Sequence, residues 1–438
     1  MTSRTKIHQA AGFLFPILVI ATAFPGLAAG FASLATAQIQ EPQAAESQAV
    51  RALDEALADS TVQAALKHVE AAKADIAALL ARLGAIISPS GSEHERAAYV
   101  AERMRAIGLQ SVAVDTSPNA VGIIPGRSGR ALVFISTLDD LATVAALQKA
   151  APQPPRVEGD RVLGPGTNTS ATTAAMLAAA EALVESGVKP EHDLVFAAVA
   201  QEETGLTGMR AVYTAHRDKA IGFVDILGDG RSISYGGLGI HWWKIVAKGL
   251  AGHSNSGGLP NVNQAIARAV DRIFSIPDPA ERKDERTILN IAMIQSGAVF
   301  NHKPETGWFS LDIRSLNSAV IEEIERKVRG VIDEVAKETG IALAMEPFQL
   351  TPAGQIPGAR DSRLVRCAEA ISRWLGLTPQ LGNAGSSNMN LAVGNGTPAI
   401  GLGGSRGGKR GEPDEWADVP AMVRTAKHVI LLAATMGK

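Results

Sequence analysis

The chain is predicted to be an α/β protein. We expect a mixed, mostly parallel sheet with helices on both faces, plus an inserted smaller α+β (ferredoxin-like) domain. Three observations predict this class. The 438 residues exceed what one ordinary core needs. Short apolar strands alternate with helices in the first and last parts of the chain. Between these parts, a β-α-β-β-α-β order indicates a small sheet with helices on one face.

Residues 1–37 have the layout of a secretory signal peptide. Three basic residues precede an apolar run over 13–29, and a small-x-small pattern follows at 35–37. Two prolines interrupt the run, which favours cleavage over the alternative of a membrane anchor. We therefore expect a periplasmic or secreted protein that is not attached to a membrane after cleavage. No later segment is apolar for long enough to span a bilayer.

The larger domain is assigned to residues 74–238 and 355–438. Before it, residues 38–73 are rich in Ala and Gln and are predicted to be a linker that leads into a helix. In a mostly parallel sheet, catalytic groups usually lie in the loops at the carboxyl ends of the strands. The predicted helices are 76–87, 93–107, 172–185, 362–375 and a last one after Pro420, and the predicted strands are 131–135, 193–200 and 398–401.

The inserted domain is assigned to residues 239–354, where the pattern of elements changes. Two helices, the second of them long and amphipathic, are spaced between strands, as a sheet covered on one face requires. Its predicted strands are 240–248, 287–294, 306–313 and 341–350, and its predicted helices are 261–274 and 318–339.

Composition excludes several kinds of site. The net charge is −2 and no basic stripe is present, so nothing predicts binding to nucleic acid. The single cysteine, Cys367, excludes an internal disulfide and a cysteine-ligated zinc site. Any metal would therefore need His and carboxylate ligands.

Four short motifs follow one another in a specific order. Ser-Pro-Ser-Gly-Ser-Glu stands at 88–93, and Gln-Glu-Glu-Thr-Gly follows an apolar strand at 201–205. Gly-His-Ser stands at 252–254, and Leu-Asp-Ile-Arg-Ser at 311–315. In order and spacing they resemble peptidase family M-twenty, which includes peptidase T, glutamate carboxypeptidase, aminoacylase and succinyl-diaminopimelate desuccinylase. The resemblance runs from about residue 76 to the C-terminus.

The resemblance implies a two-zinc site and a catalytic base. Two cations bridged by a carboxylate lower the pKa of a shared water and polarise the scissile carbonyl. By resemblance Glu202 is the base that takes the proton of this water, and Glu203 is a metal ligand. An exposed acidic loop is the alternative interpretation of this pair. If both side chains are buried without a metal, their repulsion should raise one pKa.

The resemblance also implies residues that line a substrate pocket. His253 would steady the oxyanion, and Arg314 would bind a substrate carboxylate. Asn301 and Asn390 match further pocket positions, whereas Asn388 stands where the family usually has Asp. For His253 and Arg314, an ordinary structural hydrogen bond is the alternative.

The remaining ligand positions of the family carry side chains that bind zinc poorly. The replacements are Thr137 and Gly411 for two histidines, Asn168 for the bridging Asp and Leu227 for an acidic residue. Two registers stay open, because Thr169 could take the place of Asn168, and Asp229 that of Leu227. We therefore expect no two-zinc centre, and at most one zinc.

Two functions follow from this pattern. The first is a binding protein, or a very weak hydrolase, for a small peptide or an N-acyl amino acid. The alternative is an active amide hydrolase that uses Glu202 as base, with no metal or with one metal held by Glu203, Asp139 and Asp229. With either function, a two-fold homodimer through the inserted domain is expected, because members of the family commonly pair there.

Overall fold

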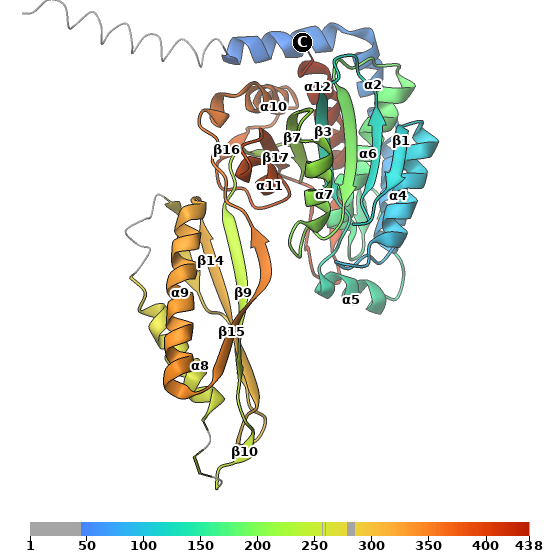
Figure 1. The fold of residues 1–438 in the computed structure, drawn as a ribbon. Coiled ribbons are helices and arrows are strands. Elements are labelled where there is room, and N and C mark those ends of the chain that lie inside the picture. Colours follow the sequence, from blue (N-terminus) through green and yellow to red (C-terminus); the bar gives the residue numbers. More distant parts are fainter. Residues whose placement is uncertain (1–44, 256, 259, 278–284, 438) are drawn as a thin grey trace, which may run out of the picture. The chain divides into compact units, whose positions relative to one another are not determined.

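The computed structural model describes residues 45–437 apart from 256, 259 and 278–284, and its central feature is an eight-stranded sheet (Figure 1). The predicted signal peptide lies outside the described residues. The strand order is β1-β2-β6-β3-β7-β17-β8-β16, and the four central strands β6, β3, β7 and β17 are parallel. The strands are β1 Gln110–Val114, β2 Ala120–Ile124, β3 Ala131–Thr137, β6 Asp193–Val199, β7 Ala220–Ile226, β8 Ser232–Ser234, β16 Gln380–Gly382 and β17 Ala399–Gly403.

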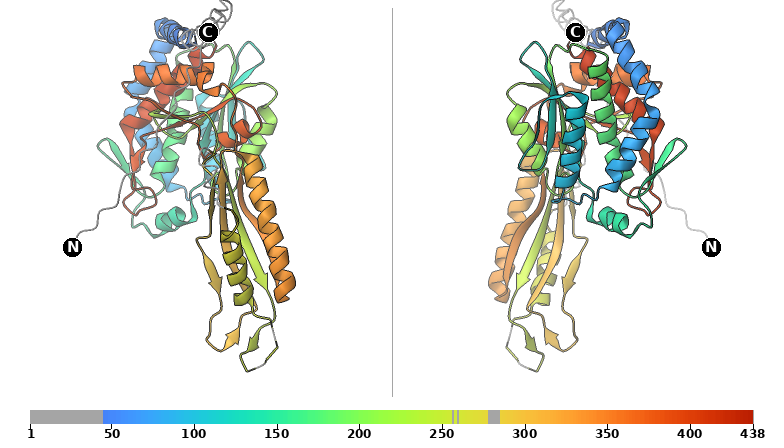
Figure 2. Two further views of the ribbon diagram at one scale, coloured as in Figure 1. Left: turned by 90° about the vertical axis from the view of Figure 1, so that its left-hand side faces the viewer. Right: turned by 90° about the vertical axis from the view of Figure 1, so that its right-hand side faces the viewer.

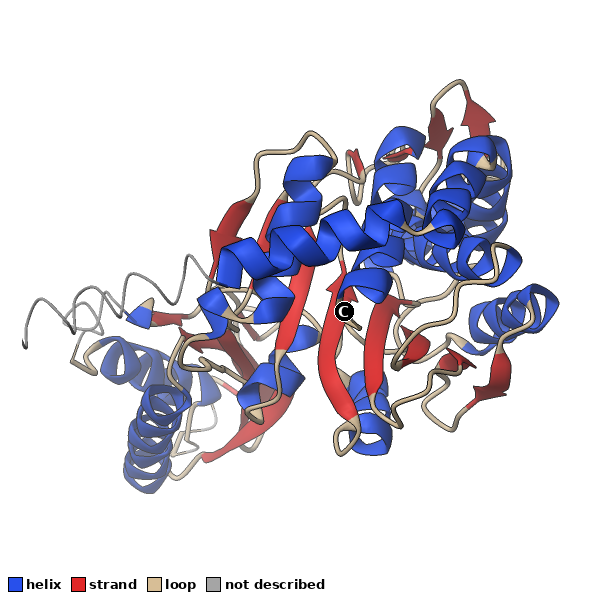
Figure 3. Ribbon diagram, turned by 90° about the horizontal axis from the view of Figure 1, so that it is seen from above, coloured by secondary structure: helices blue, strands red, loops and turns tan. Residues whose placement is uncertain are grey.

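Helices cover both faces of this sheet, which confirms the predicted fold class (Figure 3). Along β3, Leu132 and Phe134 enter one core while Val133 and Ile135 enter the other, because successive strand residues point to opposite faces. The first core contains α2 Ser60–Ala71, α3 Lys73–Ala85, α4 His94–Ile107, α6 Thr167–Glu185, α10 Arg363–Trp374 and α12 Val419–Thr435. The second contains α7 Thr207–His216 and α11 Met389–Gly394.

The remaining helices are shorter or lie before the sheet. Residues 45–58 are helical, so the described part of the predicted linker is largely helix. The others are α5 Ala142–Ala150 and a 3₁₀ turn, η2 Ala359–Asp361. No helix among the described residues is both long enough and apolar enough to cross a membrane.

The Ala-rich helix α6 starts at Thr167, five residues before the predicted start at residue 172. Gly166, with φ of 83°, precedes it in the left-handed region that glycine tolerates. The prediction missed this start because Thr, Asn and Ser have weak helix propensity. As a result, Asn168 lies in the first turn of a buried helix.

A four-stranded antiparallel sheet that the sequence did not predict lies beside the N-terminus of α6. Its order is β18-β19-β5-β4. It joins the hairpin before α6 to the loop that follows β17. Its strands are β4 Arg156–Glu158, β5 Arg161–Leu163, β18 Gly407–Gly408 and β19 Trp416–Asp418.

A five-stranded antiparallel sheet follows the predicted β-α-β-β-α-β order, except that two short strands replace the predicted strand 287–294. Its strands are β9 Gly239–Lys248, β11 Ile288–Asn290, β12 Ile294–Ser296, β14 Thr306–Ser315 and β15 Ala342–Thr351. The helices α8 Val262–Phe274 and α9 Ser318–Thr339 pack on one face (Figure 2). A separate pair, β10 Gly252–His253 and β13 His302–Lys303, is antiparallel.

Candidate functional site

The predicted acidic pair lies at the carboxyl ends of two neighbouring parallel strands. Thr137, the last residue of β3, pairs with Val199 at the end of β6. Asp139, which is fully buried, accepts hydrogen bonds from the backbone N–H groups of Glu202 at 2.9 Å and Glu203 at 3.1 Å. The Ser90 hydroxyl donates a third at 2.5 Å. Both oxygens of Asp139 therefore hold the turn that carries the acidic pair.

Glu203 forms an ion pair with Arg410. Burial raises the pKa of Glu203, and Arg410 opposes this shift. The pKa of Glu202 is raised well above its ordinary value, first by burial and then by the charges of Glu203, Asp139 and Asp225. Repulsion between neighbouring, partly buried carboxylates shifts the pKa of Glu202 in this direction.

The positions of Asn168 and Gly411 are joined by one carboxylate. Glu415 is fully buried, and its Oε1 accepts from the backbone N–H of Asn168 at 2.8 Å. Its Oε2 accepts from the N–H of Gly411 at 3.0 Å. A carboxylate at the first turn of α6 also complements the positive end of the helix dipole. This role of Glu415 was not predicted from the sequence.

Another fully buried acid, Asp225, lies at the end of β7, near Thr137. Asp225 accepts a hydrogen bond from the Met389 N–H at 3.2 Å, and Asn388 lies 3.5 Å from both Asp225 and the Thr137 hydroxyl. Burial raises the pKa of Asp225. Leu227, two residues further on, donates its N–H to the Leu402 carbonyl at 2.7 Å and offers only an apolar side chain.

Asp229 is committed to structural contacts. Its Oδ2 accepts from Arg424 Nε at 3.1 Å and Nη2 at 3.0 Å, and its Oδ1 accepts from the Ser405 N–H at 3.1 Å. The side chain is fully buried. His428, also fully buried, lies next to it, and burial lowers the pKa of this imidazole to about 4. These contacts balance the buried carboxylate of Asp229 without a metal ion.

His253 in β10 and Asn301, which precedes β13, lie together. The Asn301 amide is 3.0 Å from His253 Nε2, and the Asn255 N–H donates to His253 Nδ1 at 3.1 Å. Arg314 contacts a different residue, because its Nε lies 3.0 and 3.1 Å from the two oxygens of Asp312. The charge of Arg314 is therefore balanced within its own strand.

Asn390 forms hydrogen bonds with both segments that connect the five-stranded sheet to the rest of the chain. Its Nδ2 donates to the carbonyls of Leu238 at 2.8 Å and Pro352 at 3.0 Å, and its Oδ1 accepts from the Ser387 N–H. Beside it, Gly237 and Gly354 exchange two backbone hydrogen bonds of 2.8 and 3.1 Å. The amide is fully buried, so its contacts indicate a structural role rather than one in a substrate pocket.

The donor set does not suit a two-zinc centre. Of the preferred ligand positions, only Glu203 carries a ligand-type side chain, and it is paired with Arg410. Among the described residues, no group of three or more His, Cys, Asp or Glu side chains is arranged to hold a metal ion.

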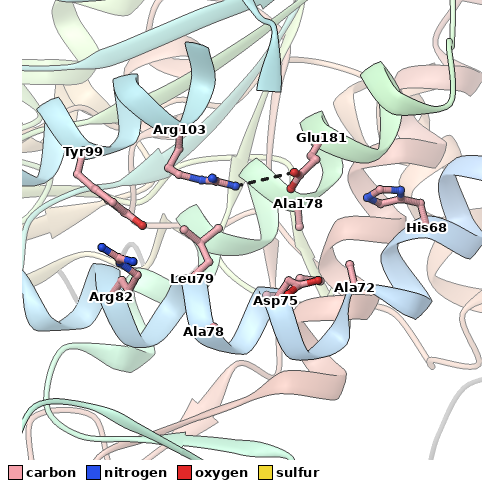
Figure 4. A pocket seen from close by; sticks show the side chains of 11 residues that line it. His68, Ala72, Asp75, Ala78, Leu79, Arg82, Tyr99, Arg103, Ala178 and Glu181 are labelled. Atoms are coloured by element: carbon pink, nitrogen blue, oxygen red, sulfur yellow. Dashed lines mark ion pairs between the residues drawn. The ribbon is translucent and has the colours of Figure 1, made fainter. Parts of the chain in front are cut away.

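A hollow of about 380 Å³ lies in the helical layer, away from the strand ends. Helices α2, α3, α4 and α6 line it, and Arg103 points toward Glu181, 3.8 Å away (Figure 4). Its charges are mixed, since Arg82 and Asp75 also line it. None of the predicted site residues belongs to this hollow.

The chain matches one family model and is similar to two curated proteins. The family model described as Peptidase family M20/M25/M40 matches residues 140–435. Carboxypeptidase G2 from Pseudomonas sp. (strain RS-16) is 29% identical over 47% of this chain, and the match spans about half, 49%, of that protein. Succinyl-diaminopimelate desuccinylase from Corynebacterium glutamicum is 26% identical over 67% of this chain and 80% of its own length.

Solved structures share the fold. Aminopeptidase PepT from Bacillus cereus aligns with a TM-score of 0.65 and 18% identity, over 84% of this chain and 99% of that one. The YXEP protein from Bacillus subtilis, described as a dinuclear metal-binding peptidase, aligns with a TM-score of 0.61 and 15% identity. That alignment covers 84% of this chain and 99% of YXEP. At such identities the likeness is evidence of the fold alone.

Proposed function

Because the chain belongs to Peptidase family M20/M25/M40, we propose that it is a binding protein, or a very weak hydrolase, for a small peptide or an N-acyl amino acid. One observation carries the proposal. Glu203, the one preferred ligand position that keeps a carboxylate, is held by Arg410 in an ion pair. A guanidinium therefore supplies positive charge where a zinc ion would be expected.

Replacing a metal ion by a guanidinium changes the chemistry. A bound divalent ion polarises a carbonyl and lowers the pKa of a water, whereas a guanidinium does not ionise water at neutral pH. It can still hold an anionic or polar group through directed hydrogen bonds. Loss of hydrolysis with retention of binding is the expected result.

The alternative of an active hydrolase has less support. A general base must be ionised, but burial and three neighbouring carboxylates keep the proton on Glu202 to a higher pH. For the single-metal version, Asp139 and Asp229 would have to give up the hydrogen bonds that they accept in the fold.

The proposal includes location and assembly. The predicted signal peptide supports a location in the periplasm or outside the cell. Small peptides and acylated amino acids are accessible ligands there. The inserted domain supports a homodimer of two-fold symmetry. Light scattering of the purified protein checks the dimer, and the N-terminal sequence of the secreted protein checks the cleavage.

Elemental analysis after purification without chelators, followed by calorimetric titration with zinc, tests the function. We expect far less than one zinc per chain and no tight binding. A panel of dipeptides and N-acetyl amino acids should bind without turnover. Two zinc ions per chain, or peptidase turnover that a chelator abolishes, would overturn the proposal.

A further inference from the structure

The loop between β17 and β19 places two arginines beside the acidic pair. Arg410 contacts Glu203, as described. Arg406 lies in the same loop and is partly buried. Its charge interacts with Arg410 and with the carboxylates of Glu202, Glu203 and Glu415. Both arginines therefore act on the position where the family would bind cations.

The two arginines differ in what balances their charge. Arg410 has a carboxylate partner, Glu203. Within the part of the chain that the structure describes, the guanidinium of Arg406 takes part in no hydrogen bond or ion pair. Burial and the nearby charge of Arg410 lower the pKa of Arg406 to about 10, so it still carries its charge at neutral pH. A partly buried cation without a direct partner favours an external anion.

The backbone around Arg406 is fixed. The preceding residue, Ser405, donates its N–H to Asp229 at 3.1 Å. The Arg406 carbonyl accepts from the Asp418 N–H at 3.0 Å, next to the pairing of β18 with β19. A cation on a backbone held at both sides loses less entropy when it binds a ligand than one on a loose loop.

We propose that Arg406 is the anchor for a carboxylate of the bound ligand, so that a fixed guanidinium replaces the metal centre as the docking point. This inference rests on the proposed binding function and specifies its ligand as an acid. A guanidinium offers two parallel N–H donors that match a carboxylate. Arg314 is the less suitable anchor, because its Nε already contacts both oxygens of Asp312.

Calorimetric titration with matched pairs of probes tests the proposal. Each N-acetyl-L-amino acid is compared with its C-terminal carboxamide, which has the same shape without the charge. A charge-assisted hydrogen bond predicts that the acid binds about 10- to 100-fold more tightly. Arg406→Gln should remove this preference, Arg406→Lys should restore part of it, and Arg105→Gln, an exposed control on α4, should leave it unchanged.

The outcomes separate this inference from the function on which it rests. If acids and carboxamides bind equally to the unmodified protein, or if Arg406→Gln keeps the preference, the anchor is wrong while the binding function stands. If no probe and no dipeptide binds, both fail. Thermal melting of each variant shows whether it folds. If Arg406→Gln does not fold, the acid and carboxamide affinities of the unmodified protein and of Arg406→Lys decide whether Arg406 is the anchor.

Discussion

Two regions of the molecule keep different parts of the family pattern. At the strand ends, the side chains expected to bind metal are replaced, and the remaining acids are engaged within the chain, as in Glu203 with Arg410 and Asp229 with Arg424. In the segment assigned to the inserted domain, His253 and Asn301 are present and adjacent. The difference teaches that motifs can be kept in one region while the ligand positions of another are replaced.

Two histidines give the largest expected contrast between the regions. His428 is buried near the strand ends, where burial lowers its pKa from 6.5 to about 4. The neutral His428 imidazole contributes its full share to the free energy of unfolding above pH 6.5. This contribution is lost as the pH falls to about 4. The shift corresponds to about 3 kcal/mol. Urea unfolding between pH 7 and 4 should show this loss, and His428→Leu should reduce it. His253→Leu is the matched control, and an equal effect there would contradict the contrast.

Arg424 tests whether Asp229 is a structural acid. Arg424→Ala leaves the buried carboxylate of Asp229 without its cation and should cost about 2–3 kcal/mol, reduced because Arg424 is 29% exposed. Denaturant unfolding at pH 7 measures it, with Arg105→Ala as control. If zinc restores the stability of Arg424→Ala, then Asp229 can act as a metal ligand and the structural interpretation is incomplete.

Two asparagines from the predicted pocket should behave differently. Asn390→Ala removes three hydrogen bonds of a fully buried amide, two of which reach half-buried backbone carbonyls, at an expected cost of about 2 kcal/mol. Asn301 is exposed, so Asn301→Ala should change the free energy of unfolding by less than about 0.5 kcal/mol. If both variants lose a similar free energy of unfolding, burial does not distinguish the roles of Asn390 and Asn301.

The effect of Glu202→Gln on stability depends on pH. The folded-state pKa of Glu202 is raised, so its contribution to stability is present below the ordinary value of 4.5 and is lost as the pH rises through the folded value. The variant should therefore gain stability relative to the parent across that window, with a slope difference of up to about 1.4 kcal/mol per pH unit. Parallel stability curves from pH 4 to 9 would show that Glu202 titrates normally.

Periodicity and order predicted much of the fold. The central strands, the two-helix insertion and the acidic pair at a strand end follow from patterns of about ten residues, which the sequence displays directly. The start of α6 was wrong by five residues, because its first turn contains Thr, Asn and Ser. The short strands of the four-stranded sheet, of two or three residues each, carry no periodic signal.

The site was less predictable because its contacts join distant segments. Arg410 meets Glu203 across 207 positions, and Arg424 meets Asp229 across 195. Lys409 and Gly411, which flank Arg410, both have positive φ, a backbone detail that composition does not reveal for lysine. Substitution at a ligand position was visible in the sequence, whereas the side chain that compensates for it was not.

The paired glycines at the entrance to the five-stranded sheet have a consequence for modularity. Because Gly237 and Gly354 face each other in an antiparallel bridge, their Cα atoms are about 5 Å apart. Cutting the chain at both points and joining the ends by a tight turn would leave the eight strands of the larger sheet intact. The fold thus has a natural splice point, at which evolution or an engineer could exchange one accessory module for another.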